Sequence, residues 1–494
     1  MFEPITPEEA GISSDRVREY LDYLERRGLV MHSVLIAKGD RLLCEAYWKP
    51  FDADFCHRMY SETKSYVAIA IGLLEEDGLL SLDEPVASYF PEKMSRELPP
   101  YLAELTVRDM LMMRTTGPAG SWFASEDPDR THLYFAAAAG TRKPCTLWEY
   151  DSAASQVLSS LAEKLSGKSL FDFLNERIFR HLGTFKTAEI LKTRNGDSWG
   201  DSALVCTPRD MLSFARFLMK GGVWEGKRLL NEDYIKTATS ALSDNNVIGF
   251  RGATKHGYGY QIWRFEEGFG FNGMGCQFTV CIPGSDLVFV CTADNQGYQA
   301  AGDLILNGFF DYIARHVSAE PLPPDPEALR AVLDYAAGLE LATALGEPDS
   351  RFIAELDGRT YVASENRTGI TRFSFRFFED GTGEFRYTNA QGDKVLPFGL
   401  GKNVYSKFPQ YGYSDGNGGL RTDNGFLYRC ASSAAFGEDR VLNLRVQIID
   451  RYFGNLTATF AFREDAVTVR MIKNAENFLD EYYGIFTARL EENA

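Results

Sequence analysis

Apolar and polar residues alternate along this chain with two different periods, which predicts separate helical and extended segments. Residues 15–27 carry apolar side chains at helical spacing, so an amphipathic helix is expected there. Two segments of period two follow, 33–38 and 41–48, and the Gly39-Asp40 pair between them is typical of a hairpin turn. The pattern therefore predicts a helix followed by a β-hairpin.

From Ser61 to Glu76 the pattern is helical and strongly apolar, and Asp77-Gly78 is expected to end this helix. Further helices are expected at 106–114, 153–165, 170–180 and 208–220. Strand-like segments return at 258–265, 277–282 and 286–292. Helices between early and late strands predict one α+β domain whose sheet is built from both ends of its sequence.

The sequence changes character near residue 320. Four prolines within residues 321–326 predict a stiff connector, and a short helix is expected at about 327–345. Short β-type segments then alternate with Gly, Asn and Asp, a pattern typical of an antiparallel barrel or sandwich. The predicted organisation is a first domain, a proline-rich linker with a short helix, and an all-β, barrel-like C-terminal domain, at 1–320, 321–345 and 346–494.

Composition and charge narrow the possible partners. Of the 494 residues, 45% are hydrophobic and 24% are charged, which is ordinary for a globular protein. The formal net charge of −17 argues against nucleic acid or an anionic membrane as a main partner. No segment approaches the roughly 18 uninterrupted apolar residues of a membrane-spanning helix, and the first ten residues lack a signal-peptide pattern. A soluble, cytoplasmic protein is expected.

Several motifs are too incomplete to support a cofactor or metal site. The eight cysteines form no C-x-x-C pair and are interpreted as free thiols in a reducing compartment. The six histidines show no clustered ligand spacing, so no metal site is predicted. Residues 268–273 match G-x-G-x-x-G, but a strand is predicted after them where a dinucleotide site needs a helix.

Ser61-Glu-Thr-Lys64 is the one S-x-x-K sequence in the chain, at the start of the apolar helix. Residues i and i+3 share a helix face, so the Lys64 amine can reach the Ser61 hydroxyl. The positive field of a helix N-terminus opposes protonation of the lysine and favours a neutral amine that can act as a base. The alternative is an N-cap serine beside a solvated lysine.

Several segments together resemble the class C β-lactamase-related serine hydrolases, which include family VIII esterases, D-aminopeptidases and penicillin-binding DD-peptidases. The segment from Ser61 to Val86 is similar to that family's nucleophile segment. Leu105–Leu111 and Arg114-Thr-Thr-Gly117 resemble the region of its H-T-S-G motif, and residues 149–158 resemble its Y-x-N segment. The similarity extends over about residues 10–315.

The resemblance implies a fold and a set of site residues. The implied fold is an antiparallel sheet flanked by helices with an all-helical lobe. Tyr150 aligns with the family's catalytic tyrosine, and Ser152 replaces its usual asparagine. The family's K-T-G or H-x-G element aligns with Phe271-Asn272-Gly273, and the N–H of Met274 is then expected to be the second oxyanion donor beside that of Ser61.

The implied activity is acyl transfer through Ser61, with Lys64 and Tyr150 moving protons and no metal or cofactor required. Because Phe271 carries no charge, an aromatic wall is expected at that position, which favours small neutral esters, amides or peptides over β-lactams. The alternative is a penicillin-binding-like protein that keeps the pocket and binds a ligand without turnover.

Overall fold

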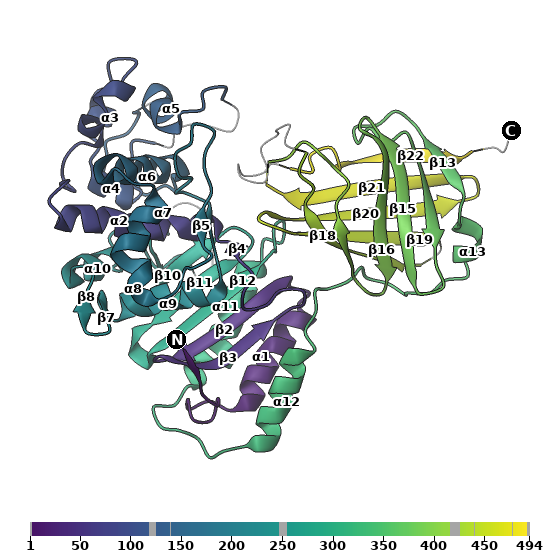
Figure 1. Ribbon diagram of the computed structural model, residues 1–494, viewed down its shortest axis with the longest axis horizontal. Coiled ribbons are helices and arrows are strands. Elements are labelled where there is room, and N and C mark those ends of the chain that lie inside the picture. The colour runs from purple at the N-terminus through teal and green to yellow at the C-terminus, as the bar shows by residue number, and fades with distance from the viewer. Residues whose placement is uncertain are drawn as a thin grey trace. The chain divides into compact units, whose positions relative to one another are not determined.

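The computed structural model describes residues 2–117, 125–138, 140–246, 254–414, 425–438, 440–476 and 478–491 (Figure 1). Contacts between residues divide the chain into two units, Met1–Glu340 and Leu341–Ala494, and each is described by itself.

A seven-stranded sheet forms the centre of the first unit. Its strand order is β1 (Glu3–Pro4), β3 (Arg41–Tyr47), β2 (Met31–Lys38), β12 (Leu287–Ala293), β11 (Gln277–Ile282), β10 (Gly268–Gly273) and β9 (Trp263–Phe265). Neighbouring strands are antiparallel, except that β1 runs parallel to β3. Strand β2 pairs with β12, with Val34 opposite Cys291. This pairing confirms that the two ends of the domain sequence build one sheet.

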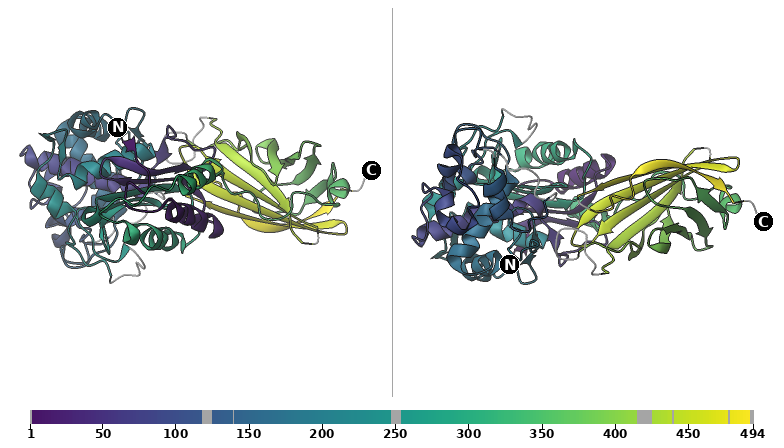
Figure 2. Two further views of the ribbon diagram at one scale, coloured as in Figure 1. Left: turned by 90° about the horizontal axis from the view of Figure 1, so that it is seen from below. Right: turned by 90° about the horizontal axis from the view of Figure 1, so that it is seen from above.

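Helices cover both faces of this sheet (Figures 1 and 2). One face packs against α1 (Ser14–Arg26), α11 (Ala301–Tyr312) and α12 (Pro326–Ala337). The other packs against α2 (Thr63–Glu76) and α9 (Pro208–Met219). The remaining helices are α3 (Pro100–Ala103), α4 (Val107–Leu111), α5 (Arg130–Ala137), α6 (Ser152–Ser166), α7 (Leu170–Leu174), α8 (Arg180–Leu182) and α10 (Glu232–Ala238). None of the described helices combines the length and the apolar character that a membrane span requires.

Short pairings outside the main sheet connect the helices. Strands β4 (His57–Arg58) and β5 (Glu189–Ile190) both pair with β6 (Leu204–Cys206), and β7 (Val223–Trp224) pairs with β8 (Lys227–Arg228). The predicted start of α9 is confirmed, because Thr207 and Asp210 form a capping box around its first turn. The predicted strand at 258–265 is shorter than expected and comprises only β9.

Helix α12 follows the proline-rich segment and packs against α1. The segment before it is tied to the same unit, because the Leu322 N–H donates to the Glu8 carbonyl oxygen. The side chain of Val332, on α12, is buried beside α1. By these contacts the proline-rich segment and its helix belong to the first unit.

The second unit is a β-barrel, as the sequence pattern predicted. Its strands follow the order β16 (Gly392–Leu400), β15 (Thr382–Asn389), β14 (Arg372–Phe377), β13 (Thr360–Ala363), β22 (Gly484–Leu490), β21 (Ala466–Ala475), β20 (Phe453–Arg463), β19 (Val441–Ile449), β18 (Arg429–Phe436) and β17 (Val404–Lys407). A parallel pairing of β16 with β18 closes the sheet, and α13 (Ile353–Leu356) precedes β13. Phenylalanines fill its core, with Phe375 packed against Phe385 and Phe460.

Candidate active site

Ser61 lies in a tight turn that leads from a strand into α2. Met59 extends β4 by donating its N–H to the Leu204 carbonyl oxygen, and a 3₁₀ turn, Tyr60–Glu62, follows. Tyr60 has a φ of 49°, a left-handed conformation that costs a non-glycine residue about 1–3 kcal/mol. The hydroxyl of Thr63 donates to the Tyr60 carbonyl oxygen at 2.6 Å and fixes this turn. The predicted helix therefore starts two residues after Ser61, and the serine occupies the turn before it.

Lys64 points back at this serine. Its Nζ donates to Ser61 Oγ at 2.8 Å and to the Asp201 carbonyl oxygen at 2.6 Å. The lysine is only 1% exposed, and its Nζ lies 5.1 Å from the centre of the Tyr150 ring. The structure therefore brings Ser61, Lys64 and Tyr150 together, and Lys64 is not a solvated side chain.

Tyr150 is held by the residues on either side of it. The Glu149 N–H donates to the Met113 carbonyl oxygen at 3.0 Å. Asp151 caps α6 by accepting from the Ala154 N–H, and it also accepts from the Thr115 hydroxyl at 2.9 Å. Burial raises the pKa of Asp151 to about 6. The Arg114–Gly117 segment therefore holds the residues around Tyr150 in place, through the hydrogen bond from Thr115 to Asp151.

Ser152 is the first residue of α6 and is partly exposed. Tyr150, two residues before it, stacks on Trp263 of β9, with ring centres 5.7 Å apart. The strand and the helical lobe therefore meet at Tyr150.

The C-terminal end of β10 approaches the Ser61 segment. A Cβ atom added to Gly273 would lie 2.1 Å from the Met59 carbonyl oxygen, so only glycine allows this approach. Asn272 is partly exposed, and Met274 is 39% exposed at the end of the strand. Gly273, and with it Met274, is therefore brought to the segment that carries Ser61.

The expectation for Phe271 is wrong. Its side chain is 0% exposed and packs in the core against Tyr66 and Phe214, with ring centres 6.0 and 5.9 Å away. Alternate residues of a strand face opposite sides, and Phe271 lies on the side that packs against α2 and α9. Phe271 therefore contributes to the core and forms no aromatic wall for a substrate.

Glu62, next to Ser61, is a fully buried carboxyl group that the sequence did not single out. Its Oε2 accepts from the Thr279 hydroxyl of β11 at 3.1 Å, while Oε1 is buried without a hydrogen-bond partner among the described residues. Burial raises the pKa of Glu62 to about 8. Glu62 is therefore mostly uncharged at neutral pH.

Asp201 and Arg130 are also absent from the sequence-based set of site residues. One carboxylate oxygen of Asp201 lies 4.0 Å from Lys64 Nζ, and the other lies 3.8 Å from an Arg130 guanidinium nitrogen. Asp201 is 137 residues from Lys64 in the sequence and belongs to no motif with it. No spacing signal could have found this pair.

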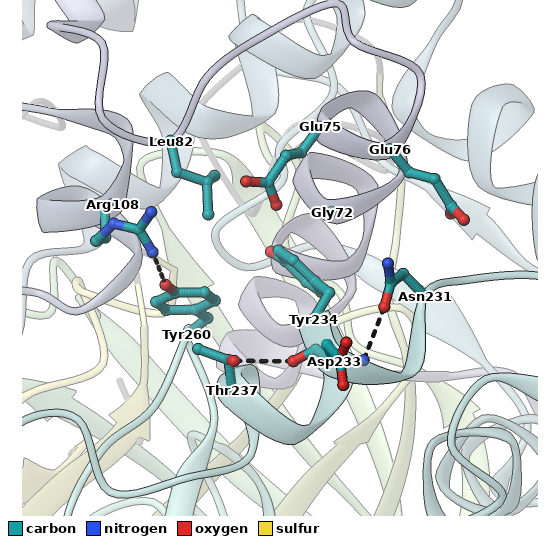
Figure 3. Close-up of a pocket in the computed structure, with 10 residues that line it drawn as sticks. All are labelled: Gly72, Glu75, Glu76, Leu82, Arg108, Asn231, Asp233, Tyr234, Thr237 and Tyr260. Carbon is teal, nitrogen blue, oxygen red and sulfur yellow. Dashed lines mark hydrogen bonds between the residues drawn. The ribbon is translucent and has the colours of Figure 1, made fainter.

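A separate pocket of about 360 Å³ lies toward the other end of α2 (Figure 3). It is lined by Gly72, Glu75, Glu76, Leu82, Arg108, Asn231, Asp233, Tyr234, Thr237 and Tyr260. Arg108 donates to the Tyr260 hydroxyl across one side of it (Figure 3). Gly72 is nine residues after Thr63, or roughly 13 Å along the helix, and the lining residues include no serine or cysteine. This pocket is not the site of Ser61 chemistry.

Comparison with known proteins gives the family and the fold of the first unit. Residues 15–305 match the family model described as Beta-lactamase. A 6-aminohexanoate-dimer hydrolase from Paenarthrobacter ureafaciens is 24% identical over 285 residues, which cover 53% of this chain and 71% of that protein. A candidate 6-aminohexanoate-dimer hydrolase from Bacillus anthracis has a similar fold, with a TM-score of 0.53, 18% identity, and coverage of 65% of this chain and 89% of that one. A β-lactamase/D-alanine carboxypeptidase from Yersinia pestis superposes with a TM-score of 0.51 at 15% identity and covers 62% of this chain and 98% of its own.

Proposed function

This chain belongs to the β-lactamase family, and from that premise we propose that it is a serine hydrolase that acts on small neutral esters or amides through an acyl-enzyme. The observation that carries the proposal is the 2.8 Å hydrogen bond from Lys64 Nζ to Ser61 Oγ. A buried amine at this distance is placed to accept the hydroxyl proton once it is in its neutral form.

In the proposed reaction, Ser61 Oγ attacks the substrate carbonyl carbon while its proton passes to Lys64. The N–H groups of Ser61 and Met274 hold the oxyanion of the tetrahedral intermediate. Proton transfer from the Lys64 and Tyr150 pair to the leaving alcohol or amine accompanies cleavage of the ester or amide bond. Water then attacks the acyl-enzyme and gives a proton to the same pair. The pair passes a proton to Ser61 Oγ as the bond to the acyl group breaks, which releases the acid and free Ser61.

The preference for neutral substrates rests on charge. Phe271 supplies no cation to the site because it is apolar and buried in the core. Arg130 lies beside Asp201, and its guanidinium faces that carboxylate. Neither of these two described residues therefore offers a substrate carboxylate the charge-assisted bond that is worth about 1.5–3 kcal/mol in proteins.

A second candidate is a ligand-binding protein without turnover, because Phe271-Asn272-Gly273 replaces the K-T-G or H-x-G element of the family. The two functions differ in whether the acyl group bound to Ser61 is hydrolysed and released. An active enzyme releases product repeatedly, whereas a binding protein forms at most one adduct per chain.

The test is labelling with an uncharged fluorophosphonate, followed by turnover assays on p-nitrophenyl esters, D-amino-acid amides, nitrocefin and the 6-aminohexanoate dimer. We expect one adduct, on Ser61, and turnover of a neutral ester or amide that Ser61→Ala abolishes. Ser65→Ala is the matched control, because Ser65 lies on the helix that follows Ser61 but is buried and donates to the Gln261 carbonyl oxygen. An adduct on another serine, or none on the folded protein, contradicts the proposal.

A further inference from the structure

Gln261 lies in the bend before β9 and is buried, with only 1% of the residue exposed. Its φ of 57° is a left-handed conformation, which is strained for a residue that carries a side chain. Such a conformation persists only where the surrounding contacts enforce it, and it is found most often at functional sites. Strong contacts around Gln261 are therefore expected, and its hydrogen bonds supply them.

The carboxamide of Gln261 joins two helices of the helical lobe. Its Oε1 accepts from the Ser155 hydroxyl of α6 at 2.6 Å, and its Nε2 donates to the Met110 carbonyl oxygen of α4 at 2.9 Å. The backbone N–H of Gln261 donates to the next carbonyl oxygen of α4, that of Leu111, at 2.9 Å. A buried amide costs free energy unless it is hydrogen-bonded, so these bonds keep α4, α6 and the bend together.

Tyr150 lies between the segments that this carboxamide joins. The N–H of the residue before it donates to the carbonyl oxygen of Met113, three residues after Met110. Its ring stacks on Trp263, two residues after Gln261, with ring centres 5.7 Å apart. Helix α6 begins two residues after the tyrosine. Loss of the carboxamide bonds would let the bend move against α4 and α6, and the Tyr150 hydroxyl would move with them.

We propose that Gln261 is a positioning residue whose carboxamide fixes Tyr150 relative to Ser61 and Lys64; this inference rests on the proposed function. The hydrogen bonds of Gln261 reach neither Ser61 nor Lys64, so it acts through the tyrosine. A displacement of about 1 Å at a catalytic group costs about 10²-fold in rate. Removing the carboxamide should therefore slow the reaction of Ser61 by about 10-fold to 10²-fold.

The experiment compares the rate of Ser61 labelling by an uncharged fluorophosphonate in the wild type, Gln261→Met, Tyr150→Phe and the double variant. Methionine is similar to glutamine in length and makes neither carboxamide bond. Gln261→Met should show the full loss in the wild-type background. In the Tyr150→Phe background it should add little, because no hydroxyl remains to be positioned. A merely structural role would give the same fold-loss in both backgrounds.

Two serines of α2 and α6 supply a matched pair of variants. Ser155 and Ser65 are both buried, and each donates its hydroxyl to Gln261 at 2.6 Å, Ser155 to the carboxamide and Ser65 to the backbone carbonyl oxygen. Ser155→Ala should slow labelling in the same way as Gln261→Met, again with little further loss in Tyr150→Phe. Ser65→Ala leaves both carboxamide bonds in place and should label near the wild-type rate.

The outcomes separate this inference from the function on which it rests. Failure of the wild type to label at Ser61 refutes the proposed function and the role of Gln261 with it. Normal labelling of the wild type, with a wild-type rate in folded Gln261→Met, refutes the role of Gln261 alone. An equal fold-loss with and without the Tyr150 hydroxyl also refutes that role. If Gln261→Met does not fold, Ser155→Ala decides by the same two comparisons.

Discussion

Replacing Glu62 by glutamine should make the first unit markedly less sensitive to alkaline pH. The pKa of this fully buried carboxyl is raised to about 8, from an ordinary value of 4.5 that applies in the unfolded chain. Between these two values the folded protein holds a proton that the unfolded chain releases. Stability therefore falls as the pH rises from about 4.5 to about 8 and levels off above it.

The size of the effect follows from the separation of the two pKa values. Each pH unit between them is worth about 1.4 kcal/mol. The destabilisation is then about 1 kcal/mol at pH 5, about 3 kcal/mol at pH 7 and about 5 kcal/mol at pH 9. Glutamine does not titrate, so the stability of Glu62→Gln relative to wild type should increase by about 4 kcal/mol from pH 5 to pH 9.

Urea unfolding followed by tryptophan fluorescence measures this difference. All six tryptophans precede residue 341, so the signal reports on the first unit alone. Any fixed cost of the new amide beside Thr279 is the same at every pH and cancels from the comparison. Glu8→Gln is the control, because Glu8 is also buried but accepts hydrogen bonds from the backbone and hydroxyl of Ser14. An equal advantage of Glu62→Gln at pH 5 and pH 9 would refute the reasoning.

Three further outcomes are expected. Lys64→Ala and Tyr150→Phe should each lower the rate of Ser61 acylation by about 10²–10⁴-fold, measured as phosphonate labelling; an unchanged rate removes that residue from the mechanism. Gly273→Ala should greatly reduce labelling, because its Cβ would meet the Met59 carbonyl oxygen, and wild-type labelling would show that the strand can withdraw without loss. A fragment of residues 1–340 should be soluble and should label at Ser61, whereas insolubility would show that the two units share a core.

Local sequence patterns were sufficient for several of the elements and for the contact between Ser61 and Lys64. The helix after Ser61 and the capping box at Thr207 depend on residues within one or two helical turns, so their spacing is visible in the sequence. The Ser61 and Lys64 contact is of the same kind, since residues three apart on a helical segment are neighbours. The alternating strands of the second unit likewise predicted its barrel.

The sequence could not give contacts between distant segments. The direction of Phe271 depends on which face of β10 packs against α2 and α9, and both faces of a central strand can be apolar. The packing of α12 on α1 depends on a partner about 300 residues earlier in the chain.

The sequence by itself determined the family and the class of fold, through several motifs that follow one another along the chain. It also determined the pair of Ser61 and Lys64, because these two residues are close together in the chain. The tertiary structure alone decided what surrounds that lysine. Asp201 reaches it from a loop far away in sequence, and Arg130 pairs with Asp201. Burial, which no local pattern measures, raises the pKa of Glu62 beside Ser61. Charge balance in a buried site depends on every group that the fold brings within a few ångströms, and only three-dimensional packing sets those distances.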